Sequence, residues 1–119
     1  MKLNNVPNLQ IENPQLASYQ YKILKESILE FQESLNPGEE VAIQLSSFGQ
    51  SMLIHINDIG YSNPCLLHFY GVLPDGSETE LIQRVNQLSF LLIAKKKLDP
   101  EAPARRMNPI GFQVAPEDD

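Results

Sequence analysis

Two histidines are the residues best suited to acid–base chemistry near neutral pH. His55 and His68 each alternate with apolar residues, in the pattern of a β-strand. If their strands are neighbours, both rings project from the sheet face opposite the main core, with Asn57 and Tyr70 close by. One interpretation makes them general bases or ligand contacts, and the other makes them half-buried strand residues satisfied by hydrogen bonds. We favour the second and keep hydrolysis that depends on His55 or His68 as an alternative.

The single cysteine limits the remaining chemistry. Cys65 and His68 have the residue types of a thiol nucleophile and its base, but three positions apart on one strand they point to opposite faces. No third ligand lies at metal-site spacing, and no glycine-rich nucleotide motif or GxSxG hydrolase motif occurs. We therefore expect no cofactor, no metal and no enzymatic activity. The lone cysteine, the lack of an apolar run of about 18 residues and the absence of a signal-peptide pattern indicate a cytosolic setting.

Polar and aromatic residues beside predicted turns are the most informative candidates for a binding site. Aromatic rings stack on planar ligands, amides read the edges of such ligands, and arginines pair with phosphate or with an acidic protein surface. Turn chemistry, helix capping and ordinary surface polarity are the alternative explanation. The candidate ligand-binding residues are Phe48, Gln50, Tyr61, Asn63, Arg84, Asn86, Arg105 and Arg106.

Charge is distributed unevenly along the chain. Fifteen acids and nine bases give a net charge of -6, which argues against an extended nucleic-acid or membrane surface. Residues 95–108, however, hold five bases against two acids, a local net charge of +3. The lysines of this segment suit the end of a predicted helix, whereas Arg105 and Arg106 follow a proline-broken linker. The segment is compatible with one small anionic ligand.

An amphipathic helix of about twenty residues is predicted after a polar arm at residues 1–12. Asn13 and Pro14 form a helix-start signal, and the Asn-Pro-Gly sequence at 36–38 stops the helix. Between these signals, apolar residues recur at spacings of three and four: Tyr21, Leu24, Ile28, Phe31 and Leu35.

The period then changes to two, which predicts an antiparallel sheet. Strands 40–46 and 52–57 form a hairpin around a turn at 47–51. A longer connection at 58–64 leads to a third strand, 65–73, which is apolar on both faces and therefore expected to be central. A turn at 74–77 precedes a fourth strand near 78–82.

A second helix is expected from Leu81 to the lysines at 95–97, because leucines and a valine recur at helical spacing from Leu81 to Leu92. Its later turns are apolar nearly all round, so we expect burial in the core or in a homo-oligomer of two or more subunits. Residues 99–104 form a semi-extended connector, and 110–114 add a closing strand. The predicted fold class is α+β, with a sheet of four to five strands in one domain over 13–114 and an acidic tail at 115–119.

Several short motifs resemble those of a family of small uncharacterised domains from bacteria and bacteriophages. They are Ser47-Phe48-Gly49-Gln50, Ile59-Gly60-Tyr61-Ser62-Asn63-Pro64, Leu81-Ile82-Gln83 running into Asn86-Gln87-Leu88-Ser89-Phe90-Leu91-Leu92, and Ile110-Gly111-Phe112. The resemblance covers residues 15–114 and implies a bacterial or phage cytosolic setting, but no activity and no catalytic residue. By size and habitat alone, phage proteins with an anti-defence role, which sequester nucleotide-derived immune signals as oligomers, are a class to consider.

The leading expectation is a non-enzymatic binding protein that sequesters a small anionic, nucleotide-like ligand in an oligomeric α+β domain. It requires Arg84, Arg105 and the two turns to converge on one concavity. The alternative is a protein-interaction module, a chaperone, antitoxin or inhibitor, that binds a host or cognate protein through the apolar second helix and the terminal segments.

Overall fold

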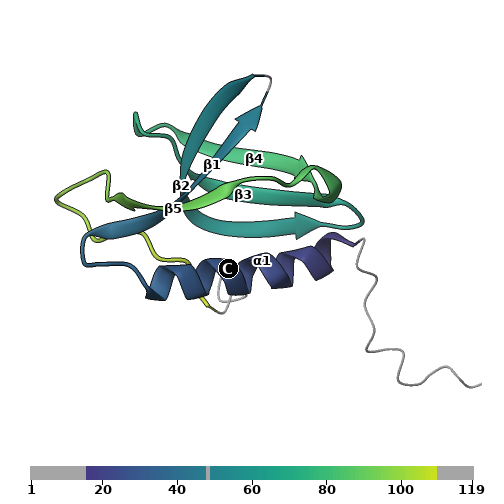
Figure 1. Ribbon diagram of the computed structural model, residues 1–119, viewed down its shortest axis with the longest axis horizontal. Helices are drawn as coiled ribbons and strands as arrows, with labels where there is room; N and C mark the ends of the chain where they lie inside the picture. Colours follow the sequence, from purple (N-terminus) through teal and green to yellow (C-terminus); the bar gives the residue numbers. More distant parts are fainter. Residues whose placement is uncertain (1–15, 48, 110–119) are drawn as a thin grey trace, which may run out of the picture.

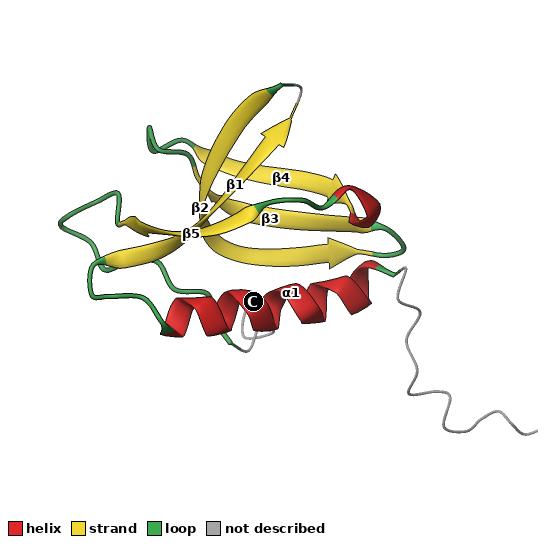
Figure 2. Ribbon diagram, viewed as in Figure 1, coloured by secondary structure: helices red, strands yellow, loops and turns green. Residues whose placement is uncertain are grey.

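A computed structural model describes residues 16–47 and 49–109 as one helix packed against a curled antiparallel sheet (Figures 1 and 2). The strand order is β4-β3-β2-β1-β5, and all neighbouring strands run antiparallel. The predicted α+β class is confirmed. The elements are α1 (Ala17–Glu33), β1 (Glu39–Ser47), β2 (Gln50–Ser62), β3 (Leu66–Val72), β4 (Glu78–Arg84), the 3-10 turn η3 (Val85–Gln87) and β5 (Leu91–Lys96).

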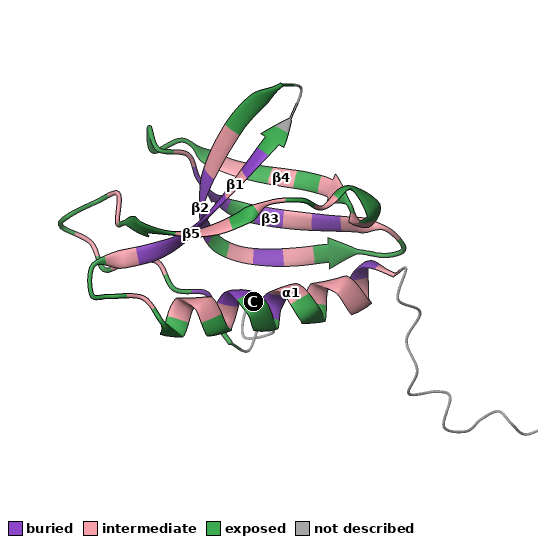
Figure 3. Cartoon of the chain, in the orientation of Figure 1, coloured by how far each residue is buried: buried purple, intermediate pink, exposed green. Residues whose placement is uncertain are grey.

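The apolar stripe of α1 packs against the sheet as its period of three and four predicts. Ile28 is buried, and the other stripe residues pack against the same core as the strands. Figure 3 shows buried positions both in α1 and in the strands beside it. The strand residues of this core are Val41, Ile43, Leu45, Ile54, Ile56, Ile59, Leu67 and Phe69.

The N-terminus of α1 is capped by the loop after β2, more than 40 residues away in the sequence. The helix begins at Ala17, and the residue before it, Leu16, supplies no side-chain cap. Instead, the Ser18 N–H donates to Asn63 Oδ1 at 3.0 Å, and the Ala17 N–H donates to the carbonyl of Pro64 at 2.8 Å. The predicted start at Asn13 lies outside the described residues; the described helix begins at Ala17, and the loop after β2 satisfies its first N–H groups.

The predicted hairpin of β1 and β2 is present, and the predicted turn at 74–77 joins β3 to β4, but β2 is longer than expected. Its first part pairs with β1, and its second part pairs with β3 through Ser62, so most of the predicted connection at 58–64 is strand. His55 pairs with Ala42 on one side and Val72 on the other, which places it at the centre of the sheet. The interior position of β3 agrees with its two apolar faces.

A bulge between Ile56 and Asp58 bends β2 where it passes from β1 to β3. Gly71 faces this point, and a Cβ atom there would lie 2.0 Å from the carbonyl oxygen of His55. A residue larger than glycine would therefore force the two backbones apart, and the bend depends on this glycine.

The expected second helix is wrong. Residues 81–84 complete β4, Val85–Gln87 form η3, and Leu91–Lys96 form β5 at the free side of β1. A helical spacing of apolar residues is ambiguous where the later part is apolar on every side, since a short apolar run is compatible with either a helix or a strand. Pairing with β1 and β3 satisfies the backbone of this segment, and that long-range pairing overrides the local period.

The chain after β5 returns across β1 to the helix without forming helix or strand, as predicted for the proline-rich connector. Met107 is buried in the core, and its backbone is held by the Gln32 amide. The Met107 N–H donates to Gln32 Oε1 at 2.7 Å, and Gln32 Nε2 donates to the Met107 carbonyl at 3.2 Å. The predicted arm at 1–12, closing strand at 110–114 and acidic tail at 115–119 lie outside the described residues.

Among the helices of residues 16–47 and 49–109, none has the length and apolar character needed to span a membrane.

Asn63→Ala is expected to destabilise the protein by about 1 kcal/mol, because α1 loses the acceptor for a terminal N–H group. Asn63→Asp retains an oxygen acceptor and places a negative charge at the helix N-terminus, so it is expected to keep the wild-type stability. Urea unfolding followed by circular dichroism measures both. Asn86→Ala, an exposed amide in η3, is the control, and a loss for Asn63→Ala no larger than that control would contradict the capping role.

Candidate functional site

The predicted binding residues are spread over separate parts of the described structure. Gln50 is exposed at the tip of the β1–β2 hairpin, and Asn86 is exposed in η3. Tyr61 and Asn63 lie at the opposite end of β2, beside the start of α1. Phe48 lies outside the described residues. The Val85 N–H donates to the Cys65 carbonyl at 2.9 Å, so Arg84 and Asn86 lie at the same end of the sheet as Asn63, whereas Gln50 lies at the other end of β2.

Tyr61 and Asn63 serve the packing of α1. The Tyr61 ring contacts Tyr21 of the helix with 5.0 Å between ring centroids, although nearly half of the Tyr61 surface stays exposed. The buried Lys25, one helical turn further on, lies 3.5 Å from Asp58 of β2. Together with the Asn63 cap, these contacts fasten the N-terminal half of α1 to the second part of β2.

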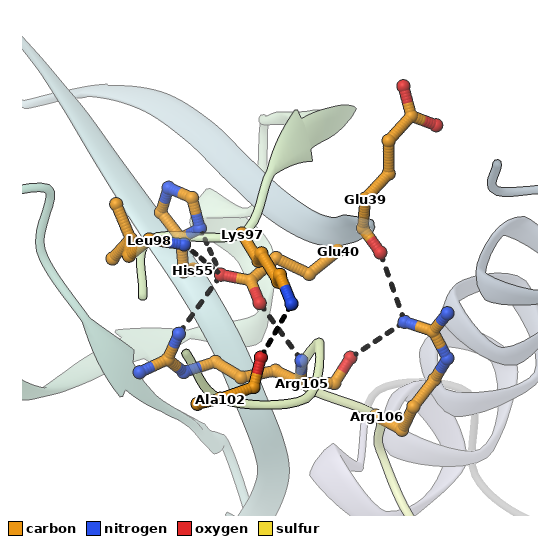
Figure 4. Close-up of polar contacts among 8 residues, drawn as sticks. All are labelled: Glu39, Glu40, His55, Lys97, Leu98, Ala102, Arg105 and Arg106. Atoms are coloured by element: carbon orange, nitrogen blue, oxygen red, sulfur yellow. Dashed lines mark hydrogen bonds and ion pairs between the residues drawn. The ribbon is translucent and has the colours of Figure 1, made fainter. Parts of the chain in front are cut away.

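Arg105 is engaged by a buried carboxylate at the start of β1 (Figure 4). Glu40 is fully enclosed, and its Oε2 lies 3.0 Å from Arg105 Nη1 and 2.7 Å from His55 Nδ1. The Arg105 N–H donates to Glu40 Oε1 at 2.9 Å, and the Leu98 N–H donates to Oε2 at 3.4 Å. A buried carboxylate needs such partners to stay ionised, so this cluster is structural.

The contacts of Glu40 determine its ionisation. Burial by itself would raise the pKa of this carboxyl, but the Arg105 backbone N–H, His55 and the Arg105 guanidinium donate to it or attract its charge. Together they hold the pKa of Glu40 below its ordinary value of 4.5.

The other two arginines differ in how firmly they are held. Arg106 Nη1 donates to the carbonyl oxygens of Glu39 and Arg105, at 3.1 and 3.0 Å. Arg84 is exposed at the end of β4, and its Nη1 lies 3.7 Å from Cys65 Sγ, a weak acceptor. Arg84 is therefore the predicted arginine that a ligand could recruit most easily.

Both histidines make hydrogen bonds, as the favoured interpretation expects, but their surroundings differ. His55 is buried beside Glu40, whereas His68 lies near the surface between Ser62 and Glu80. The expected nearness of Tyr70 to His68 is confirmed by nearly parallel rings with centroids 6.1 Å apart. The oxygen partners of the two histidines, Glu40, Ser62 and Glu80, were not predicted, although the tight turn at 74–77 fixes the register that brings β3 and β4 side by side.

A hollow of about 340 Å³ lies between β1 and the connection from β4 to β5. Uncharged hydrogen-bonding side chains and one aromatic ring dominate its described lining. Phe90 also packs edge-on against the core residue Phe69, with centroids 5.4 Å apart. The lining residues are Gln44, Leu45, Ser46, Gln83, Gln87, Ser89, Phe90 and Leu91.

Gln83 lines this hollow, and its side-chain oxygen is buried without a hydrogen-bond donor in the described structure. Its Oε1 is buried, and within residues 16–47 and 49–109 it has no hydrogen-bond partner. A buried amide oxygen without a donor is costly, by about 1 to 3 kcal/mol. A bound molecule with an N–H or O–H group would remove that cost.

In the described part of the chain, no group of three or more histidine, cysteine, aspartate or glutamate residues is placed to bind a metal ion.

Arg105→Met is expected to lower the free energy of unfolding by about 3 kcal/mol, because it leaves Glu40 buried without its cationic partner. Arg106→Met is the matched control, since Arg106 contacts exposed backbone carbonyls, and it is expected to change stability by about 0.5 kcal/mol or less. Denaturant unfolding of the two variants tests this, and equal effects would show that Glu40 does not depend on Arg105.

Glu40 is also expected to contribute to acid sensitivity. Its pKa is lowered in the folded state, so its stabilising effect is fully present above about pH 4.5 and is lost as the pH falls through the folded pKa. The difference in unfolding free energy between the wild type and Glu40→Gln should therefore shrink as the pH falls below about 4.5. A series of urea titrations between pH 3 and 7 measures it, and a constant difference would be the contrary result.

Comparison with known proteins identifies a family and no activity. No curated protein and no solved structure matches the chain. The model of DUF6173, a family of unknown function, matches residues 13–112. The expected membership in an uncharacterised family is thus confirmed, and the bacterial or phage setting stays a prediction. Since the match spans most of its length, the chain belongs to the DUF6173 family.

Proposed function

We propose that this protein is a binding protein, and that the hollow between β1 and the β4–β5 connection holds the planar, hydrogen-bonding part of a small nucleotide-like ligand. The observation that carries the proposal is the buried Oε1 of Gln83, which has no donor in the described structure. A ligand N–H group directed at this oxygen would complete its hydrogen bonding.

The chemistry of the lining supports a ligand such as a nucleobase. Glutamine side chains donate through the amide nitrogen and accept through the oxygen, and serine hydroxyls do both. Gln83, Gln87 and Ser89 are therefore able to read a ligand edge that alternates donors and acceptors. Phe90 supplies an aromatic surface for a planar ring.

The lack of charged side chains in the described lining suggests that the hollow would recognise the uncharged part of the ligand. The described lining has no charged side chain, and Arg105 and Arg106 already have partners in the fold. Arg84, next to Gln83 in the chain, has only a weak thiol contact to give up for a phosphate oxygen. We therefore expect nucleosides to bind, with a phosphate group adding a smaller contribution.

Gln83→Leu separates binding from folding. It removes the unpaired oxygen, so the free protein is expected to be as stable as the wild type or slightly more stable, while affinity falls about tenfold or more. Thermal-shift and calorimetric titrations would use the four common ribonucleosides, their 5′-monophosphates and cyclic dinucleotides. The control is Gln50→Leu, which alters an exposed glutamine at the hairpin tip and is expected to bind normally.

Two outcomes would contradict this function. One is the absence of any shift with the whole panel for a folded wild-type sample. The other is equal binding by the wild type and Gln83→Leu, which would place the ligand elsewhere.

The protein-interaction alternative is supported by a different feature. β5 is an edge strand of the described sheet, and its first residue, Leu91, is 63% exposed. An exposed edge with an apolar side chain can accept an extended segment of a partner protein. Leu91 also lines the hollow, so the discriminating variant is Ala94→Lys, at an exposed residue of β5 outside that lining. In a pull-down with wild type, Ala94→Lys and Gln83→Leu, a protein partner would be lost only with Ala94→Lys.

Oligomerisation and the cytosolic location also stay predictions. The second helix that motivated a homo-oligomer is not formed by residues 81–97. The edge strand β5 is therefore the surface through which subunits would associate. Sedimentation analysis of the full chain decides the subunit number.

A further inference from the structure

Three polar side chains on neighbouring strands form a continuous hydrogen-bonded chain on the sheet. Ser62 Oγ lies 2.8 Å from His68 Nε2, and His68 Nδ1 lies 2.7 Å from Glu80 Oε2. These residues come from the end of β2, from β3 and from β4. Ser62 is exposed, and the His68 side chain keeps about 15% of its surface open to solvent.

The strand register fixes this arrangement. His68 pairs with Gly60 on β2 and with Ile82 on β4. Ser62 and Glu80 each stand two residues from those partners, so both are diagonal neighbours of His68 on the same face of the sheet. Because side chains alternate with period two, no rearrangement of the backbone is needed to align the three groups.

The donor and acceptor groups determine which way the hydrogen bonds run from Ser62 through His68 to Glu80. An ionised carboxylate only accepts, so the Glu80 contact keeps the proton of His68 on Nδ1. Nε2 then carries the lone pair and accepts from the Ser62 hydroxyl. This order of hydroxyl, base and orienting carboxylate is the arrangement that activates a serine nucleophile.

Two neighbours complete the site. The Tyr70 ring lies nearly parallel to His68 and over Gly60, where a Cβ atom would be 3.3 Å from Tyr70 Cε2, so it limits the positions open to the imidazole. Arg84 stands in the same cross-strand row as Ser62, with Leu66 between them. That row spans about 10 Å between the outer Cα atoms, a distance that an arginine side chain can cover toward a group bound at Ser62.

We propose that Ser62, His68 and Glu80 form an acyl-transfer site that hydrolyses small carboxylic esters, a function separate from binding in the hollow beside Gln83. Ser62 Oγ attacks the ester carbonyl carbon while its proton passes to His68 Nε2. The C–O bond to the alcohol breaks, and His68 returns the proton to the leaving oxygen. Water, deprotonated by His68, then attacks the acyl-serine, releases the acid and restores the Ser62 hydroxyl.

Neighbouring charges limit the substrate class. A hollow of about 410 Å³ beside Glu80 is lined by Glu78, Asn57 and Tyr70 among others, and burial together with the charges of Glu80 and Asp58 raises the pKa of Tyr70. This negative environment disfavours anionic substrates. Arg84 is the cation available for the oxyanion that forms at the attacked carbonyl. The substrates expected are therefore uncharged or cationic esters.

The direct test is covalent labelling of the full-length wild-type protein with a fluorophosphonate probe, followed by peptide mass spectrometry. We expect the label on Ser62. Hydrolysis of p-nitrophenyl acetate by the same sample should fall at least about a hundredfold in Ser62→Ala and His68→Ala. Ser27→Ala, an exposed serine of α1, is the matched control and should retain the activity.

Glu80 is a positioning residue, since it contacts His68 and not the substrate. Glu80→Gln should lower kcat with little change in KM, and Glu80→Asp should restore part of kcat, which a merely structural role would not produce. Thermal melts confirm that each variant is folded. The proposal is overturned if folded wild-type protein shows no label on Ser62, or if ester hydrolysis survives in Ser62→Ala.

Discussion

The buried carboxylate of Glu40 is the constraint on which much of the molecule depends. A fully enclosed negative charge is tolerated only where donors surround it. The groups that contact Glu40 are His55 of β2, the Leu98 N–H and Arg105, which are all far from Glu40 in the sequence. Satisfying Glu40 therefore folds the last described part of the chain back over β1. The same return path delivers Met107 to the core and to the Gln32 side chain of α1.

The sheet register produces a diagonal histidine–carboxylate pair twice, and the two pairs differ in their surroundings. Each histidine contacts a carboxylate that stands diagonally across from it, two residues from its paired neighbour. At His55, two flanking strands and the returning chain exclude water, so the pair holds the structure together. At His68, part of the side chain stays exposed and the exposed Ser62 hydroxyl completes the contacts, so the site can be reached from solvent through Ser62. The difference in burial assigns His55 a structural role and leaves His68 for the proposed chemistry.

The hollow beside Gln83 is a product of the way the sheet curls. β4 and β5 are at opposite edges in the strand order, yet only residues 85–90 connect them. So short a connection requires a strong bend, which the bulge after Ile56 and the close approach at Gly71 provide. The connection then passes over β3, where Phe90 meets Phe69, and leaves the amide and hydroxyl groups facing a space of their own.

The sequence by itself determined the class of the fold, the amphipathic stripe of α1, the hairpin of β1 and β2 and the turn between β3 and β4, because these depend on local periodicity and turn residues. It did not determine the structure of residues 81–97, since a short apolar run suits a helix or a strand, and only pairing with β3 and β1 decided between them. The partners of Asn63, Arg105 and His68 were equally hidden. Asn63 and Arg105 bind groups 45 and 65 positions away in the chain, and His68 lies between two strands. Which polar residues serve the fold and which stay free for chemistry is therefore decided by tertiary contacts, because hydrogen bonding and burial depend on neighbours that local sequence does not specify.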